Sequence, residues 1–201
     1  MAKLVNWHRF ENSLKEKGQI IFTPLDIRRI LKISKVSATF LIHRYAKKGF
    51  IQRLKRGVYS FPDTSIPDVY LANKLYAPSY VSLEFALSFY RIIPEVTYEI
   101  TSVTTKPTRK FSAQDKIFSF RKIKKEAFGG YYLLRKEGIN GLIAEPEKAL
   151  VDLLYLSLRS KKKKGFLLRI NRQLLNVNKA LRYAKLFKDK KLTPLIKELF
   201  K

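Results

Sequence analysis

Four side chains that could carry acid–base or metal chemistry lie close together in the sequence: Glu145, Glu147, Lys148 and Asp152. Carboxylates beside a lysine are groups that metal-dependent nucleases and general acid–base catalysts use. The spacing argues against both, because Glu147 and Asp152 are poorly placed for one helical face. Glu145 and Lys148 would need a further acid to hold a cation. Acids at the start of a helix, where the dipole is positive, explain Glu145 and Glu147 more simply.

Other catalytic patterns are missing from the sequence. The chain has no Cys, which excludes disulfides, thiol catalysis and cysteine-ligated metal. Its two His residues, His8 and His43, have no acidic cluster beside them, so we expect no zinc site. Ser79 and Ser82 lack a plausible His base. We therefore expect a protein that is not an enzyme and that holds no cofactor and no metal.

Charge is the dominant feature of the composition. The 201 residues include 42 Lys and Arg against 16 Asp and Glu, for a net charge of +26. Residues 1–62 hold 14 basic and 3 acidic residues, and residues 161–201 hold 14 and 2, while the middle is nearly balanced. Nucleic acid is the commonest polyanion that such a surface meets. A solvated, Lys-rich surface inherited from genome composition is the alternative, but such a bias would raise the acids too.

The N-terminal part reads as three helices, over residues 7–17, 23–31 and 34–48, with a short extended piece between the first two. Thr23 and Ser34 are natural N-caps, and Gly18 and Gly49 are natural helix ends. We expect the buried faces to hold Trp7, Phe10, Leu14, Leu25, Ile27, Ile30, Leu31, Ala38, Leu41, Ile42 and Tyr45. On the third helix we expect the cap and the outward residues to meet DNA: Ser34, Lys35, Ser37, Thr39, His43 and Arg44.

A basic hairpin is predicted directly after the third helix. "FIQRL" and "GVYSF" alternate apolar and polar residues around the turn "KRG". Phe50, Ile51, Val58 and Tyr59 are expected to point inward. The tip carries three cations that could reach phosphates or a minor groove, namely Arg53, Lys55 and Arg56.

A tight turn joins the second and third predicted helices, the third ends in "KKGFI", and a hairpin follows. This order of elements resembles the winged helix-turn-helix family. The resemblance covers about residues 7–62 and implies that helix 34–48 enters a major groove while the wing contacts the backbone. Winged helices also serve as protein–protein modules, and the basic charge favours DNA over that alternative.

The middle of the chain carries a second resemblance. Three helices are predicted: one in "VYLANKLY", one that Ser82 can cap, and one in "EPEKALVDLLYLSL". Strands are predicted in "VTYEITSVTT", "KIFSFRKI" and "NGLIA". The blocks "LYAPSYVSLEFALSFYRIIPE", "ITSVTTKPTRKF" and "IAEPEKALVDLLYL" look like the AbiEi-type antitoxin family of type IV toxin–antitoxin pairs. The blocks occur in the family's order behind a winged helix, but Phe85 and Arg91 stand where a small residue and a Gly are more usual.

The AbiEi-type resemblance implies a cytoplasmic transcriptional repressor that binds double-stranded DNA at the operator of its own operon. Its functional partner would be a nucleotidyltransferase-like toxin, which it would counter without a stable complex. We expect no membrane contact, because no run of about 18 apolar residues and no apolar signal core occurs.

The basic tail is predicted to form short helices over about 166–175, 178–188 and 194–200, the last capped by Thr193 and Pro194. Its cations give a second expected DNA contact: Lys161, Lys162, Lys163, Lys164, Arg169, Arg172, Lys179, Arg182 and Lys185. A merely solvated face is the alternative. We thus expect an α+β protein with a winged helix-turn-helix at 1–62 and an antitoxin-like domain at 63–201, whose basic helical part is 161–201. An RNA-binding accessory protein and, less simply, a cryptic nuclease are the rival functions.

Overall fold

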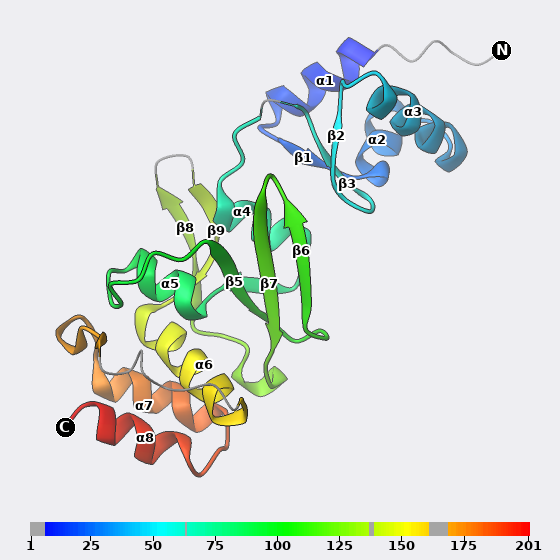
Figure 1. Ribbon diagram of the computed structural model, residues 1–201. Coiled ribbons are helices and arrows are strands. Elements are labelled where there is room, and N and C mark those ends of the chain that lie inside the picture. The colour runs from blue at the N-terminus through cyan, green and yellow to red at the C-terminus, as the bar shows by residue number, and fades with distance from the viewer. Residues whose placement is uncertain (1–6, 63, 137–138, 161–168) are drawn as a thin grey trace. The chain divides into compact units, whose positions relative to one another are not determined.

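The computed structural model describes residues 7–62, 64–136, 139–160 and 169–201 of the chain (Figure 1). The chain divides into two compact units, Met1–Ile66 and Pro67–Lys201. Both units combine helices with a β-sheet, so the fold class is mixed α+β. In the described part of the chain, no helix has the length and apolar character that crossing a bilayer requires.

The first unit runs α1 (Trp7–Glu16), β1 (Ile21–Phe22), α2 (Pro24–Leu31), α3 (Lys35–Lys47), β2 (Gln52–Lys55) and β3 (Val58–Ser60). Local chemistry explains the helix boundaries. Thr23 and Asp26 form a capping box at the start of α2, with Pro24 in its first turn. Gly18 and Gly49 adopt left-handed φ angles of 60° and 76° after α1 and α3.

The three strands of this unit form an antiparallel sheet in which β3 is central and pairs with both β1 and β2. The β2–β3 connection is a tight turn whose Gly57 has a φ of 79°, a value that favours glycine. The register shifts between Arg53 and Lys55, so β2 carries an irregularity just before the turn. The hairpin predicted from "FIQRL" and "GVYSF" is therefore present, as an outer strand and a central strand.

The core of the first unit confirms most of the predicted inward residues. Its buried members are Phe10, Leu14, Phe22, Ile27, Ala38, Leu41, Ile42, Ile51 and Phe61, with Ile30, Leu31, Tyr45 and Tyr59 partly buried against them. Two predictions are wrong: Leu25 is 46% exposed and Phe50 is 49% exposed. Leu25 lies in the first turn of a short helix whose buried position is Ile27. Phe50 precedes β2 and packs against Tyr45, with 5.7 Å between the two ring centroids, instead of entering the core.

The second unit is built on a six-stranded mixed sheet with the order β6-β7-β5-β4-β9-β8. Its strands are β4 (Ser79–Val81), β5 (Glu99–Thr104), β6 (Arg109–Ala113), β7 (Lys116–Lys122), β8 (Tyr131–Lys136) and β9 (Ile139–Ala144). The predicted strands correspond to β5, β7 and β9. We did not predict β4, β6 and β8, because β4 has three residues and the other two are edge strands with weak alternation.

Helices cover both faces of this sheet. They are α4 (Asp68–Leu75), α5 (Leu83–Phe89) and α6 (Pro146–Arg159), with a 3₁₀ turn, η1 (Lys125–Ala127), before β8. Neighbouring residues of a strand point to opposite faces. On β5, the Thr101 hydroxyl bonds to the Phe85 amide of α5, while Ser102 is paired with Phe120 of β7. The Phe120 ring contacts Tyr76, just after α4, at 5.3 Å, so α4 and α5 lie on opposite faces.

A close approach fixes α4 against the sheet. Gly141 lies on β9 where a Cβ would fall 2.9 Å from Val69 Cγ1 and 3.0 Å from the Tyr70 amide nitrogen. The Asn73 side chain, on the same helix, donates hydrogen bonds to the carbonyls of Ser79 and Leu142, at 3.4 and 3.3 Å. Because Gly141 has no side chain, α4 can lie close enough to the sheet for the Asn73 side-chain amide to bond to both β4 and β9.

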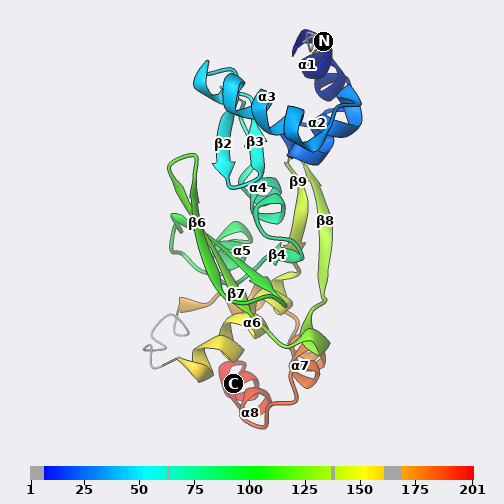
Figure 2. The same cartoon turned by 90° about the vertical axis from the view of Figure 1, so that its right-hand side faces the viewer.

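Three elements follow α6: the 3₁₀ turn η3 (Arg172–Leu174), α7 (Val177–Leu186) and α8 (Leu192–Leu199). Both helices pack against α6, which lies between them and the sheet (Figures 1 and 2). The predicted helix over 166–175 is wrong in its described part, where Asn171 caps only the 3₁₀ turn η3. The predicted Thr193–Pro194 cap is also wrong, because α8 begins at Leu192, two residues before Pro194.

Candidate nucleic-acid interface

The first turn of α3 is held by its own side chains. The Ser34 hydroxyl accepts a hydrogen bond from the Ser37 amide at 3.1 Å and lies 2.9 Å from the Ser37 hydroxyl. The Thr39 hydroxyl donates to the Lys35 carbonyl at 3.0 Å. All four residues are exposed. The turn is therefore fixed in position, and within the described residues the Lys35 ammonium forms no ion pair that would compete with a ligand.

The outward face of α3 also contains two apolar residues that the sequence reading missed. Val36 is 64% exposed and Phe40 is 72% exposed. They are four residues apart, so they are neighbours on one face of the helix. His43 and Arg44 are exposed on the next turn, where the Arg44 guanidinium lies 5.2 Å from the centre of the Tyr45 ring. An apolar side chain at such a position can meet the methyl group of thymine in a major groove.

The tip of the β2–β3 hairpin carries the three predicted cations. Arg53 and Arg56 are exposed, and Lys55 is half-buried. Arg53 and Lys55 precede the turn in β2, while Arg56 is in the turn itself. The flanking residues Leu54 and Val58 are buried. The hairpin is therefore anchored by its apolar residues and presents its guanidinium groups to solvent.

The predicted cations of the tail are in different environments. Lys161, Lys162, Lys163 and Lys164 lie outside the described residues. Arg169 forms an ion pair with Glu95, with its Nη2 atom 2.6 Å from Glu95 Oε1. Arg172 is exposed in η3. Arg169 is thus engaged within the protein, which lowers its availability for an external phosphate.

Arg182 and Lys185 belong to a groove between α7 and α8. The groove has a volume of about 550 Å³ and is lined by Asn178, Leu181, Arg182, Lys185, Thr193 and Lys197. Its three cations come from both helices and are exposed. Among the described residues, no acidic one lines it. A positively charged groove of this kind suits a phosphate backbone.

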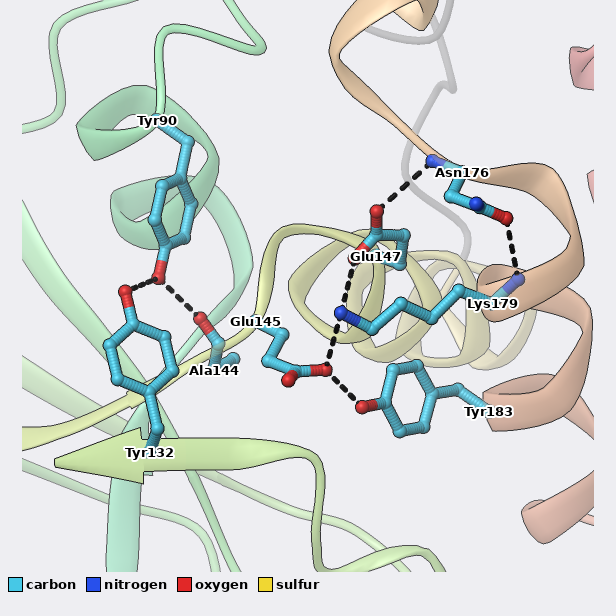
Figure 3. A network of polar contacts seen from close by, with 8 residues as sticks. All are labelled: Tyr90, Tyr132, Ala144, Glu145, Glu147, Asn176, Lys179 and Tyr183. Atoms are coloured by element: carbon cyan, nitrogen blue, oxygen red, sulfur yellow. Dashed lines mark hydrogen bonds and ion pairs between the residues drawn. The ribbon is translucent and has the colours of Figure 1, made fainter.

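Lys179, also on α7, is not part of this basic groove but of an internal polar network (Figure 3). Its Nζ atom lies 3.0 Å from Glu145 Oε2 and 3.5 Å from Glu147 Oε2. Glu147 also accepts a hydrogen bond from the Asn176 amide at 3.0 Å, and the Tyr183 hydroxyl donates to Glu145. The two acids that we interpreted as helix-start residues therefore tie the beginning of α6 to α7.

Electrostatics reinforce this network. The hydrogen bond with Glu145 raises the pKa of Lys179. Burial raises the pKa of Glu145, but hydrogen bonds from Tyr183 and Lys179 outweigh burial, so the pKa is lowered overall. Both shifts favour the charged forms. Lys179 therefore pairs with Glu145 and Glu147, which leaves it less available to a nucleic-acid surface than we expected for this residue of the tail.

The other two members of the titratable cluster form a buried ion pair. Lys148 Nζ bonds to Asp152 Oδ1, and both side chains are fully buried. The Asp152 Oδ2 atom accepts hydrogen bonds from the hydroxyls of Tyr80 and Ser82, at 3.1 and 2.8 Å. Burial raises the pKa of Asp152 and lowers that of Lys148, while the ion pair opposes both shifts. The sequence does contain a signal for this pair: a Lys and an Asp four residues apart in a largely apolar helix.

Within the described residues, no group of three or more His, Asp or Glu side chains is placed to hold a metal ion. Comparison of the sequence with protein-family models and with curated proteins gives no match.

Proposed function

We propose that the chain is a DNA-binding transcriptional repressor whose first unit is a winged helix-turn-helix. One observation carries the proposal. The capped first two turns of α3 expose Lys35, Ser37 and Thr39, and the chain continues into a hairpin with exposed Arg53 in its first strand and exposed Arg56 in its tight turn. This order of elements, with a basic outer surface on both the helix and the hairpin, is the order that the winged helix family uses.

The geometry of α3 supports base reading. A major groove about 12 Å wide admits one helix, and small residues in the first turn let that end approach the bases closely. Lys35 can donate to guanine, and Ser37 and Thr39 can exchange hydrogen bonds with either kind of base edge. Phe40 and Val36 add apolar surface that can distinguish thymine by its methyl group.

The β2–β3 hairpin is better suited to holding the protein on the DNA backbone than to reading the base sequence. Arg53, Lys55 and Arg56 are long cations that suit phosphates or a narrow minor groove. A protein fixed in this way over a promoter blocks polymerase sterically, without chemistry. The α7–α8 groove, with Arg182, Lys185 and Lys197, would add affinity that does not depend on sequence.

The antitoxin role rests on the AbiEi-type resemblance of the second unit. That role makes the chain the regulator of its own operon and the opponent of a nucleotidyltransferase-like toxin, in the cytoplasm and without a stable complex. Glu145, which precedes α6, and Glu147, Lys148 and Asp152 within α6 all make internal contacts, which supports a structural role for them. None of the four lines the α7–α8 groove.

An RNA-binding accessory role is the second candidate, and the α7–α8 groove favours it. The groove combines three cations with only two short polar side chains, Asn178 and Thr193. Such a lining binds a backbone without reading bases, and it does not by itself distinguish RNA from DNA.

Binding of the full chain to three ligands across a salt series tests the proposal. The ligands are the duplex upstream of its own gene, a scrambled duplex of equal length, and a structured RNA of equal charge. We expect the upstream duplex to bind at least about a thousandfold more tightly than the scrambled one. Tighter binding to the RNA than to the upstream duplex would reject the repressor and favour the RNA-binding role.

A further inference from the structure

A small cavity in the second unit has no part in the proposed DNA contacts. It has a volume of about 170 Å³. Its floor is the face of the sheet that carries Thr101 of β5 and Arg121 of β7. Its walls are the start of α5, at Leu83 and Glu84, and the last turns of α6, with Leu153 and Leu156. Apolar and charged side chains thus face one space.

The start of α5 is locked beside this cavity. The Thr101 hydroxyl accepts a hydrogen bond from the Phe85 amide at 3.0 Å and donates to the Ser82 carbonyl at 2.7 Å. The Ser82 hydroxyl is turned away and donates to the buried Asp152, so Thr101 does the capping that Ser82 was expected to do. Leu83, the first residue of α5, has a φ of 62°. This left-handed conformation is strained for a branched side chain. Such strain persists only where the surroundings impose it.

Two of the four charges at the cavity are already paired with each other. Lys110 Nζ lies 2.9 Å from Glu99 Oε1. The other two charges belong to Glu84 and Arg121. In the part of the chain that the structure describes, neither side chain forms an ion pair or a hydrogen bond. Burial raises the pKa of Glu99, and the charge of Arg121 is among the interactions that lower it overall. One wall therefore offers a carboxylate and the floor offers a guanidinium, and both are half-exposed.

We propose that this cavity binds a small zwitterion with an aliphatic side chain, that is, an aliphatic α-amino acid. Arg121 would take the ligand carboxylate, which a guanidinium can bind with two parallel hydrogen bonds. Glu84 takes the ammonium group, and Leu83, Leu153 and Leu156 surround the aliphatic part. Because liquid water occupies about 30 Å³ per molecule, the cavity holds the volume of about five or six waters, which suits a ligand of this size. The proposal does not depend on DNA binding by the first unit.

Calorimetric titration of the full chain with L-leucine tests the site. We expect saturable binding of L-leucine, and at least tenfold weaker binding of leucine methyl ester and of 4-methylpentanoate, which lack the carboxylate and the ammonium group respectively. Glycine, which has both charges but no aliphatic part, should also bind at least tenfold more weakly. Absence of heat with L-leucine at millimolar concentration, or equal binding of all four compounds, would overturn the proposal.

Charge-matched variants separate the site from general electrostatics. Glu84→Gln and Arg121→Gln should each weaken L-leucine binding at least tenfold. The controls Glu126→Gln and Arg135→Gln remove exposed charges from η1 and β8 and should leave it unchanged. Arg121→Gln should reduce the preference for leucine over its methyl ester, and Glu84→Gln should reduce the preference for leucine over 4-methylpentanoate. Equal losses in a site variant and its control would assign the binding to net charge and overturn the proposal.

Discussion

The Ser34 hydroxyl accepts a hydrogen bond from the Ser37 amide, 3.1 Å away, and this bond defines the start of α3. The cap satisfies a donor that the first turn of a helix otherwise leaves open. It therefore holds Lys35 and Ser37 at a fixed place on the exposed end of α3. The proposed reading of bases depends on that placement.

Replacing Lys35 or Thr39 by Ala should alter base preference. Each good base contact contributes about 1–3 kcal/mol of discrimination, so the preference for the upstream duplex over a scrambled duplex should fall about 5- to 150-fold for each lost contact. Competition binding measures this ratio. Lys47→Ala, at the other end of α3, is the control and should leave the ratio unchanged. If both α3 variants kept the wild-type ratio, α3 would not be the reading helix.

Arg56→Ala should weaken binding to all duplexes alike. A phosphate contact carries no sequence information, and its loss should flatten the slope of log affinity against log salt by about 0.9. The control is Lys125→Ala, an exposed cation of η1 in the second unit, which should keep the wild-type slope. A loss confined to one sequence would instead identify Arg56 as a base-reading residue.

Breaking the buried ion pair of α6 should destabilise the second unit strongly. Lys148→Met leaves the Asp152 carboxylate buried without its counter-ion, which costs about 3–5 kcal/mol. The double variant Lys148→Met, Asp152→Asn should recover most of that loss, because both charges are then gone while the amide oxygen can still accept from Tyr80 and Ser82. Hydrogen exchange of the α6 amides is the suitable measurement, since the one Trp of the chain lies in the first unit. A double variant as unstable as the single one would show that the pair is not a coupled unit.

The Glu145–Lys179 contact should make stability fall in acid. The pKa of Glu145 is lowered in the folded protein, so its contribution is present above its ordinary value of 4.5 and is lost as the pH falls through the folded value. The raised pKa of Lys179 has the opposite sign, and its contribution is lost only as the pH rises past 10.5. Glu145→Gln should therefore cost about 1 kcal/mol or less at pH 7 and flatten the acid limb of the stability curve.

Glu126→Gln is the control for that pH profile. Glu126 is an exposed acid of η1, and its replacement should leave the acid limb as steep as in the wild type. An unchanged acid limb in Glu145→Gln would mean that the Figure 3 network does not couple protonation to folding.

Gly130 and Gly129 form a matched pair of sites beside the same network. Gly130 has a φ of 71°, and a Cβ there would fall 2.6 Å from Tyr183 Cε1. Gly130→Ala should lower the unfolding free energy of the second unit by about 2–3 kcal/mol, from left-handed strain and crowding. At Gly129 no atom lies within 4 Å of the added carbon, so Gly129→Ala should be neutral or raise stability by up to about 1 kcal/mol. Equal effects on chemical unfolding would contradict the packing of Tyr183 against Gly130.

The first unit could be predicted well because its signals are local. Thr23, Ser34 and Gly49 act within one turn of their own positions, so their neighbours in sequence are enough to identify them. Leu25 and Phe50 were misplaced because hydrophobicity alone does not say which of several adjacent apolar residues enters the core. The exposure of Val36 and Phe40 was missed for the same reason.

The second unit was predicted less completely because long-range contacts decide its geometry. Ser82 had the right position for a cap, but its hydroxyl bonds to Asp152, 70 residues away in sequence. The capping bond comes instead from Thr101, on a strand. The sequence predicts Lys179 as a surface cation, but in the structure it lies beside Glu145 and Glu147. Pairings of this kind leave no local pattern in the sequence.

Methylation interference on the upstream duplex tests the central claim most directly. Guanine N7 lies in the major groove and adenine N3 in the minor groove, so the positions at which methyl groups block binding reveal which groove each element occupies. The account predicts a cluster of blocking guanine N7 positions that disappears with Lys35→Ala and persists with Arg56→Ala. Binding that tolerates methylation at every guanine N7 would show that α3 does not enter the major groove and would contradict the proposed repressor.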